Sequence, residues 1–144
     1  YARNDVSAIP VKAVVSYAGP TDMLDENFFI NNDLGVQNVE MLLSRATGET
    51  VTQATIGNFE EQIKEVSPLY YVNKNTVPTI INHGQKDTIV PYSNAVSLAA
   101  AFEAAGAEYI FNTYPNSGHG LDADNAISSE TDNQFREYIN TYLK

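Results

Sequence analysis

The sequence predicts an α/β fold, built on a mainly parallel sheet of about three strands with helices on its faces. Two stretches, residues 77–91 and 108–120, favour this fold, because each begins as a β-rich apolar run and ends in a Gly-containing polar loop. A strong helix pattern over Pro91–Gly106 separates the two strands. This order favours parallel strands that are joined by a right-handed crossover.

An earlier strand is expected over Val11–Ala18, a nearly continuous apolar run that ends at Gly19-Pro20. Such a run is typical of a strand that is buried on both faces between two neighbours. A complete small sheet would have a polar or protected edge, so this strand is expected to lack one neighbour. We therefore expect an isolated chain to self-associate through residues 11–18.

Residues 25–67, between the first two strands, are the least regular part of the sequence. Short helices are expected over Asn38–Ala46 and Ile56–Val66, the second from the helical spacing of its apolar residues. The region is predicted to form either a lid over the substrate or ordinary covering helices.

Two longer helices are expected in the second half of the chain. Pro91–Gly106 begins with a proline, has an Ala-rich face that permits close packing on a sheet, and stops at a glycine. Ser128–Leu143 has an apolar stripe formed by Phe135, Tyr138, Ile139 and Tyr142. Both helices are predicted to cover the sheet.

Composition limits the classes of partner and chemistry. The 144 residues are 43% hydrophobic and 18% charged, as in an ordinary globular domain. Eighteen acidic and eight basic residues give a net charge of −10, which disfavours nucleic acid and anionic lipid as partners. No apolar run is long enough for a membrane span. The absence of cysteine excludes a thiolate nucleophile and gives no information on whether the protein is cytoplasmic or secreted.

Asp87 and His119 are the candidate catalytic residues, because each follows the end of a predicted strand. Neighbouring parallel strands lie about 4.8 Å apart, and ligands of open α/β sheets bind outside the carboxyl ends of the strands. A carboxylate on Nδ1 would fix the histidine tautomer and stabilise the imidazolium that forms when Nε2 accepts a proton from serine. The alternative is that Asp87 caps a turn and His119 is a surface histidine.

The segment His83–Pro91, together with Gly118-His119-Gly120, resembles the acid and histidine portion of the α/β-hydrolase superfamily. The most similar branch is that of esterases and lipases, which is related to prolyl-oligopeptidase-type peptidases. Val11–Met23 resembles the strand after the nucleophile helix, and Ser67–Val72 the segment that leads into the acid-bearing strand. The resemblance implies that residues 1–144 form the C-terminal part of a single catalytic domain.

The sequence does not contain a recognisable nucleophile. The pattern G-x-S-x-G occurs nowhere in the 144 residues, and the superfamily order Ser, Asp, His implies a serine a few helical turns before Tyr1. Ser16, Ser93 and Ser117 are interpreted as a strand residue, a helix cap and a loop-stabilising residue. We therefore expect the nucleophile-bearing N-terminal half, with its oxyanion-hole donors, to be absent and the chain alone to be inactive.

Other polar residues fit structural roles better than catalytic ones. Asp22 also follows a strand end and could serve as the acid, but turn capping is the favoured role. His83 is interpreted as a structural histidine at a strand-to-loop corner. The two histidines make a poor ligand set, and Asp122–Asn125 lacks the glycine and distal glutamate of a calcium loop. No metal and no cofactor is predicted.

The resemblance implies that the intact parent protein is a serine-dependent carboxylesterase or lipase-like enzyme acting on a small-molecule ester. Asp87 would orient the histidine, and His119 would act as general base and acid. A serine peptidase of the prolyl-oligopeptidase type is the close competitor. A second class is a non-catalytic α/β binding module in which Asp87 and His119 are incidental. The sequence does not separate ester from peptide substrates.

Overall fold

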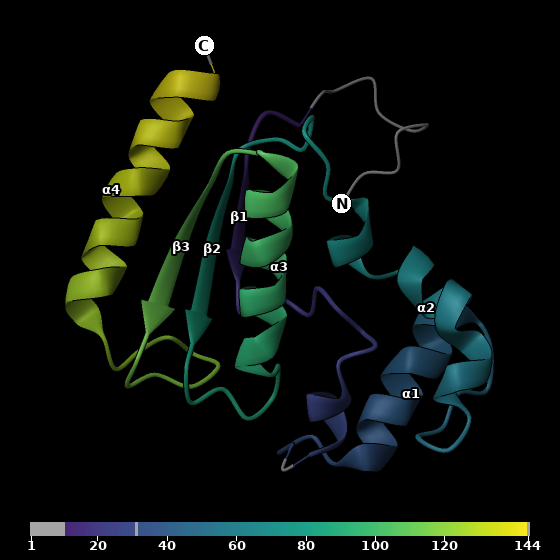
Figure 1. The fold of residues 1–144 in the computed structure, drawn as a ribbon. Coiled ribbons are helices and arrows are strands. Elements are labelled where there is room, and N and C mark those ends of the chain that lie inside the picture. Colours follow the sequence, from purple (N-terminus) through teal and green to yellow (C-terminus); the bar gives the residue numbers. More distant parts are fainter. Residues whose placement is uncertain (1–10, 31, 144) are drawn as a thin grey trace.

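The computed structural model describes residues 11–30 and 32–143. Within these ranges the centre of the fold is a parallel three-stranded sheet in the order β1-β2-β3 (Figure 1). The strands are β1 (Val14–Tyr17), β2 (Thr79–Gly84) and β3 (Tyr109–Tyr114). The predicted α/β class and the parallel direction of the strands are confirmed. Residues 1–10, where the resemblance expects the end of the nucleophile helix, lie outside the described residues.

Helices make up most of the remaining structure. They are η1 (Glu26–Phe29), α1 (Val36–Thr47), η2 (Ile56–Phe59), α2 (Glu60–Glu65), η3 (Pro68–Tyr71), α3 (Tyr92–Ala105) and α4 (Asn125–Tyr142). The helix expected over residues 56–66 is divided into η2 and α2, and η1 and η3 have no counterpart in the prediction. One-turn 3-10 helices are too short to leave an apolar period in a sequence. None of the described helices has the length and apolar character needed to cross a membrane.

Helix α3 packs on one face of the sheet, as its sequence predicts. Ile81 of β2 lies in one apolar cluster with Leu98 and Phe102 of α3, and all three side chains are buried. The helix ends at Gly106, whose φ of +64° is a left-handed conformation that glycine adopts at little cost. Side chains alternate along a strand, so the residues next to Ile81 point to the opposite face.

Helix α4 covers that opposite face through polar contacts. Asn112 of β3 donates from Nδ2 to Asn82 Oδ1 at 3.0 Å and to Gln134 Oε1 at 2.7 Å. Thr131 Oγ1 lies 2.8 Å from the hydroxyl of Tyr114. These groups are mostly buried, so their mutual hydrogen bonds offset the cost of removing them from water. The centre of the α4 contact is therefore polar.

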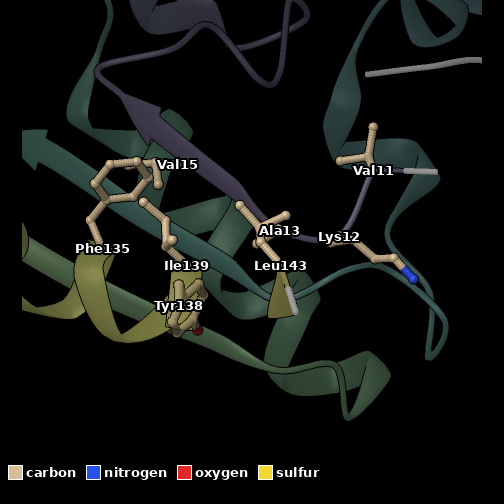
Figure 2. A pocket seen from close by; sticks show the side chains of 8 residues that line it. All are labelled: Val11, Lys12, Ala13, Val15, Phe135, Tyr138, Ile139 and Leu143. Carbon is tan, nitrogen blue, oxygen red and sulfur yellow. The ribbon is translucent and has the colours of Figure 1, made fainter. Parts of the chain in front are cut away.

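The apolar stripe of α4 lies at the margin of the sheet instead, beside β1. A groove of about 350 Å³ separates the two elements, with Val15 of β1 on one side and Phe135, Ile139 and Leu143 on the other (Figure 2). Phe135 and Ile139 remain exposed, while Tyr138 is buried. The predicted stripe is therefore only partly buried, because Thr131 and its neighbours occupy the central contact.

Strand β1 forms an edge of the sheet and is shorter than the expected Val11–Ala18. Its side chains are half-buried, and Tyr17 is 55% exposed. The side chains are thus less buried than predicted, and among the described residues β1 has β2 as its single neighbour. The amide of Val14 donates to the carbonyl of Pro78, which precedes β2, and the amide of Ala18 donates to the carbonyl of Asn82 in β2. By alternation, the backbone groups of Val15 and Tyr17 face the open side.

Residues 25–67 form a separate small layer beside α3 (Figure 1). Their buried core contains Phe28, Val39, Leu43, Val51 and Ile63, together with Val90 from the loop after β2. Covering helices are thus present in this region, and its role as a lid stays a prediction.

Candidate active site

Asp87 and His119 meet at the carboxyl ends of two neighbouring strands. The register aligns the ends of β2 and β3, pairing Gly84 with Tyr114, so the loops that follow begin at the same level. His119 Nδ1 lies 2.9 Å from Asp87 Oδ2. The predicted proximity of the two side chains is confirmed, and their catalytic role stays a prediction.

The two loops are also joined through their backbones. The amide of Lys86 donates to the carbonyl of Ser117 at 3.0 Å. A Cβ atom on Gly84 would lie 2.3 Å from the carbonyl oxygen of Gly118, well inside van der Waals contact. Glycine is therefore required at position 84 for close approach of the histidine loop.

The Asp87 carboxylate is fully buried and accepts hydrogen bonds at both oxygens. Oδ1 accepts from the amides of Ile89 at 2.8 Å and Val90 at 3.0 Å. Oδ2 lies 2.9 Å from His119 Nδ1 and 3.1 Å from His83 Nε2. Burial alone would raise the pKa of Asp87, but the hydrogen bonds from His83, His119 and the two amides together lower it to about 2. The carboxylate is therefore ionised at neutral pH.

His119 presents its other ring nitrogen away from this contact. A carboxylate can only accept, so Nδ1 of His119 carries a proton, and in the neutral ring Nε2 is then unprotonated. The side chain is 42% exposed. The arrangement can therefore accept a proton at Nε2 from a group placed beside the ring, while Asp87 stabilises the resulting imidazolium.

His83 is a buried partner of the same carboxylate, with 1% of its side chain exposed. Its Nε2 lies 2.9 Å from the carbonyl of Val90 as well as near Asp87. Both groups accept only, so Nε2 carries the proton. The ring stands edge-on to Tyr92, with 6.0 Å between centroids. The interpretation of His83 as a structural residue fits, but sequence reasoning missed its contact with Asp87. The contact depends on the tight turn from Gly84 to Asp87, which folds position 87 back towards position 83 and leaves no signal in the sequence.

Asp124 holds the histidine loop from its far end. Its carboxylate accepts from the amide of Asn116 at 3.0 Å, from Asn116 Nδ2 at 2.9 Å and from Ser117 Oγ at 2.6 Å. The hydrogen bond from Ser117 is the main cause of a lowered Asp124 pKa. The predicted loop-stabilising role of Ser117 is confirmed. Within the described ranges, no three His, Asp or Glu side chains are grouped to hold a metal ion.

The remaining candidates lie in structural positions. Asp22 Oδ1 accepts from the amide of Leu24 at 3.1 Å, which is the predicted turn-capping role. Ser16 lies in β1. The prediction that Ser93 caps a helix is wrong, because α3 begins at Tyr92 with Pro91 at its N-cap and no side chain of the described residues caps it. The hydroxyl of Ser93, one residue inside the helix, donates to the carboxylate of Asp25 instead.

A shallow cavity of about 520 Å³ lies beside the acid, between the loop after β2 and the segment around η1. Asp87 forms part of its wall, together with polar residues such as Gln85 and Lys86 and with apolar Ile30 and Tyr92. Its mixed lining differs from the apolar groove at β1 and α4. Among the described residues, this cavity offers no purely apolar pocket for a long acyl chain.

Comparisons with known proteins point to hydrolases. The sequence matches the BD-FAE family over residues 1–102. It is 28% identical to the esterase LipC of Mycobacterium tuberculosis over 92 residues, which are 62% of this chain and 23% of LipC. It is 29% identical to the acylamino-acid-releasing enzyme of Arabidopsis thaliana over 115 residues, or 78% of this chain and 13% of that enzyme.

Solved structures give the same fold. A truncated carbohydrate esterase from gut microbiota superposes with a TM-score of 0.65 and 29% identity, covering 89% of this chain and 42% of that one. The acylaminoacyl peptidase of Pyrococcus horikoshii gives a TM-score of 0.67 at 18% identity, over 91% of this chain and 20% of the peptidase. The chain thus spans less than half of each of these proteins. Asp87 lies inside the family match and His119 beyond it.

Proposed function

Because the chain belongs to the BD-FAE family and has the α/β-hydrolase fold, we propose that it supplies the acid and the histidine of a serine carboxylesterase. The observation that carries this proposal is the 2.9 Å contact between His119 Nδ1 and Asp87 Oδ2. The contact lies at the carboxyl edge of a parallel sheet, where open α/β sheets bind their ligands.

In the proposed reaction, His119 moves the proton and Asp87 keeps its charge. Nε2 of His119 accepts the serine proton as the serine oxygen attacks the ester carbonyl. The imidazolium then gives this proton to the departing alkoxide, leaving an acyl-enzyme that water hydrolyses by the same steps. The pKa of about 2 keeps Asp87 ionised throughout, so it stabilises the imidazolium without taking its proton.

The serine is proposed to come from a polypeptide segment outside these 144 residues. No serine among these residues lies in a G-x-S-x-G context. Ser117 is buried against Asp124 in the histidine loop, and Ser93 is bonded to Asp25. Their hydroxyls are thus already used in structural contacts, which favours an external nucleophile.

A peptidase acting on acylated peptides is the second candidate. The Arabidopsis relative supports it, because the match covers 78% of this chain. The ester reading is favoured by a further esterase, LipQ of Mycobacterium tuberculosis, which is 33% identical over 67 residues, and by the identity to the carbohydrate esterase. The solved acylaminoacyl peptidases fall below this level of identity and support the fold alone.

The test uses the intact parent protein and begins with the coding sequence upstream of Tyr1, in which we expect a G-x-S-x-G serine. Hydrolysis of p-nitrophenyl acetate, an acetylated sugar and an N-acetylalanine anilide would separate esterase from peptidase. Asp87→Asn and His119→Ala are each expected to lower kcat/KM about 10³- to 10⁴-fold. Asp122→Asn, an exposed carboxylate in the histidine loop, is the matched control and should leave the rate unchanged.

Retention of more than about a tenth of the activity by both Asp87→Asn and His119→Ala would exclude the triad, since each triad member normally contributes far more. An upstream sequence without a nucleophile, combined with no hydrolysis of any of the three substrates, would favour the binding module instead.

A further inference from the structure

The loop that carries His119 has little to fix it at its own residues. His119 lies between Gly118 and Gly120, and glycine leaves the backbone unusually free. The next residue, Leu121, has φ of +54°, a conformation that costs free energy for a side chain of this kind. A loop of this composition holds an imidazole in one place only if it is tethered elsewhere.

Asp124 provides such a tether in an unusual way. It stands at the N-cap position of α4, where an aspartate ordinarily accepts from an amide of its own helix. Among the described residues no side chain caps this helix. The carboxylate, with 9% of the residue exposed, turns back across the loop to Asn116 and Ser117 instead.

Ser117 extends the tether to the acid loop. Its hydroxyl donates to Asp124 at 2.6 Å and accepts from the amide of Ala123 at 3.0 Å. Its carbonyl accepts from the amide of Lys86, the residue before Asp87. One buried residue thus joins the far end of the histidine loop to the loop that holds the acid.

We propose that Asp124 is a positioning residue, which fixes the loop so that His119 Nδ1 faces Asp87. This inference rests on the proposed function and adds a residue that acts through Asn116 and Ser117 without touching the reacting atoms. Asparagine at position 124 would replace one carboxylate oxygen by an N–H₂ group, which cannot accept the hydrogen bonds that Asn116, or Asn116 and Ser117, donate to that oxygen. At least one of these hydrogen bonds would then be lost, and the loop would loosen.

The experiment compares Asp124→Asn with Asp25→Asn in the intact protein. Asp25 is a matched control, because its carboxylate also accepts from a backbone amide, Asn27 N of η1 at 2.9 Å, and from a side-chain amide, Asn94 Nδ2 at 2.8 Å. The first readout is the ¹⁵N spectrum of the His119 ring, which reports the tautomer. We expect one Nδ1–H form in the unsubstituted protein and in Asp25→Asn, and a mixture of tautomers in Asp124→Asn.

The second readout is the ester kinetics. A small misplacement of a catalytic group can cost up to about 10²-fold in rate, so Asp124→Asn should lower kcat about 10- to 100-fold with KM nearly unchanged. Asp25→Asn should keep kcat within about threefold of the unsubstituted enzyme even if both variants unfold at a similarly reduced temperature. If Asp124→Asn fails to fold, Ser117→Ala removes the central link alone and should give the same two effects at smaller size.

An unchanged His119 spectrum in folded Asp124→Asn or Ser117→Ala would overturn the proposal, as would equal loss of kcat in Asp124→Asn and Asp25→Asn. These outcomes differ from failure of the proposed function. If the proposed function fails, His119→Ala keeps its activity. The ¹⁵N spectrum of the His119 ring still reports in that case whether Asp124 holds the ring in one position.

Discussion

Asp87 combines complete burial with full charge, and its surroundings explain how. Two backbone amides fix one carboxylate oxygen and two histidines approach the other, so each lone-pair direction has a donor. Removing such a charge from water is costly unless its hydrogen bonds are complete. The same four hydrogen-bond donors orient Oδ2 towards His119. The stability of the site and its proposed chemistry therefore depend on one set of contacts.

This environment makes Asp87 a determinant of acid stability. Its pKa is about 2 in the folded protein against an ordinary 3.8, so the carboxylate favours the folded state above about pH 4, and this contribution is lost as the pH falls towards 2. The shift corresponds to about 2 kcal/mol of unfolding free energy. Urea unfolding at pH 5 and pH 2.5 measures it, and Asp87→Asn should lack this part of the pH dependence. An equal acid loss in Asp87→Asn would assign the effect to other carboxylates.

His83 can be tested separately from the proposed reaction. His83→Leu leaves the carboxylate without one donor and should lower the unfolding free energy by about 2 kcal/mol, as for other hydrogen bonds to charged groups. His83→Gln retains an N–H group of similar reach and should lose less. Urea denaturation of both variants decides the point, and identical losses would mean that packing, rather than the hydrogen bond, accounts for the role of His83.

The proximity of Asp87 and His119 could be predicted from the sequence, because each stands where a strand pattern gives way to a polar loop. The roles of His83 and Asp124 could not. The contact of His83 with Asp87 depends on a turn that brings the chain back to the end of β2. The contact of Asp124 with Ser117 depends on a side chain that points away from the helix whose N-cap it occupies. Residue type and spacing do not encode either direction.

At the scale of elements, the close approach of the two loops at the ends of β2 and β3 determines how the site is held together. Gly84→Ala would place a methyl group 2.3 Å from the Gly118 carbonyl and 2.4 Å from that of Ser117. Both neighbours are backbone atoms, so the loops must part. We expect a loss of about 1–3 kcal/mol in unfolding free energy, together with a lower rate of ester hydrolysis.

Gly57→Ala is the control for this substitution, because a Cβ atom at position 57 would have no neighbour within 4 Å. Thermal unfolding of the two variants should separate them clearly. If Gly84→Ala is as stable and as active as Gly57→Ala, the close approach of the loops is not required.

The helices could be predicted where the face that packs on the sheet is also the apolar face. The start and stop signals of α3 gave its bounds to within a residue, because a proline and a glycine delimit an Ala-rich segment. The packing face of α4 was assigned less well. Asn82 and Asn112 occupy the sheet positions beneath it, and their amides select Thr131 and Gln134 over the apolar stripe.

At the scale of the whole molecule, we expect association at the side of β1 that has no strand neighbour among the described residues. Strand edges with free N–H and C=O groups pair readily with other strands, and here the apolar groove along α4 lies beside the edge. We expect two copies of the 144-residue chain to pair along β1. Sedimentation velocity over a concentration series should show a dimer, and Val15→Lys, which places a charge in the groove, should shift it to monomer.

A chain that stays monomeric at all concentrations would contradict this expectation. Salt offers an independent check, because a net charge of −10 repels a second copy and higher ionic strength screens that repulsion. Association through β1 should therefore strengthen with salt.

The small core of residues 25–67 meets the acid loop at Ile89 and Val90, just after Asp87. The hydrogen bonds that orient Asp87 come from the backbone of those two residues and from the two histidines, and among the described residues none comes from residues 25–67. Sequence change in the outer layer can thus accumulate without altering the acid and base, provided that Val90 remains packed and that Asn32 and Asp33 keep their hydrogen bonds to Ile89 and Thr88. Divergence among descendants of such a protein would therefore be fastest around α1 and α2 and slowest in the two loops, which hold the proposed acid and base.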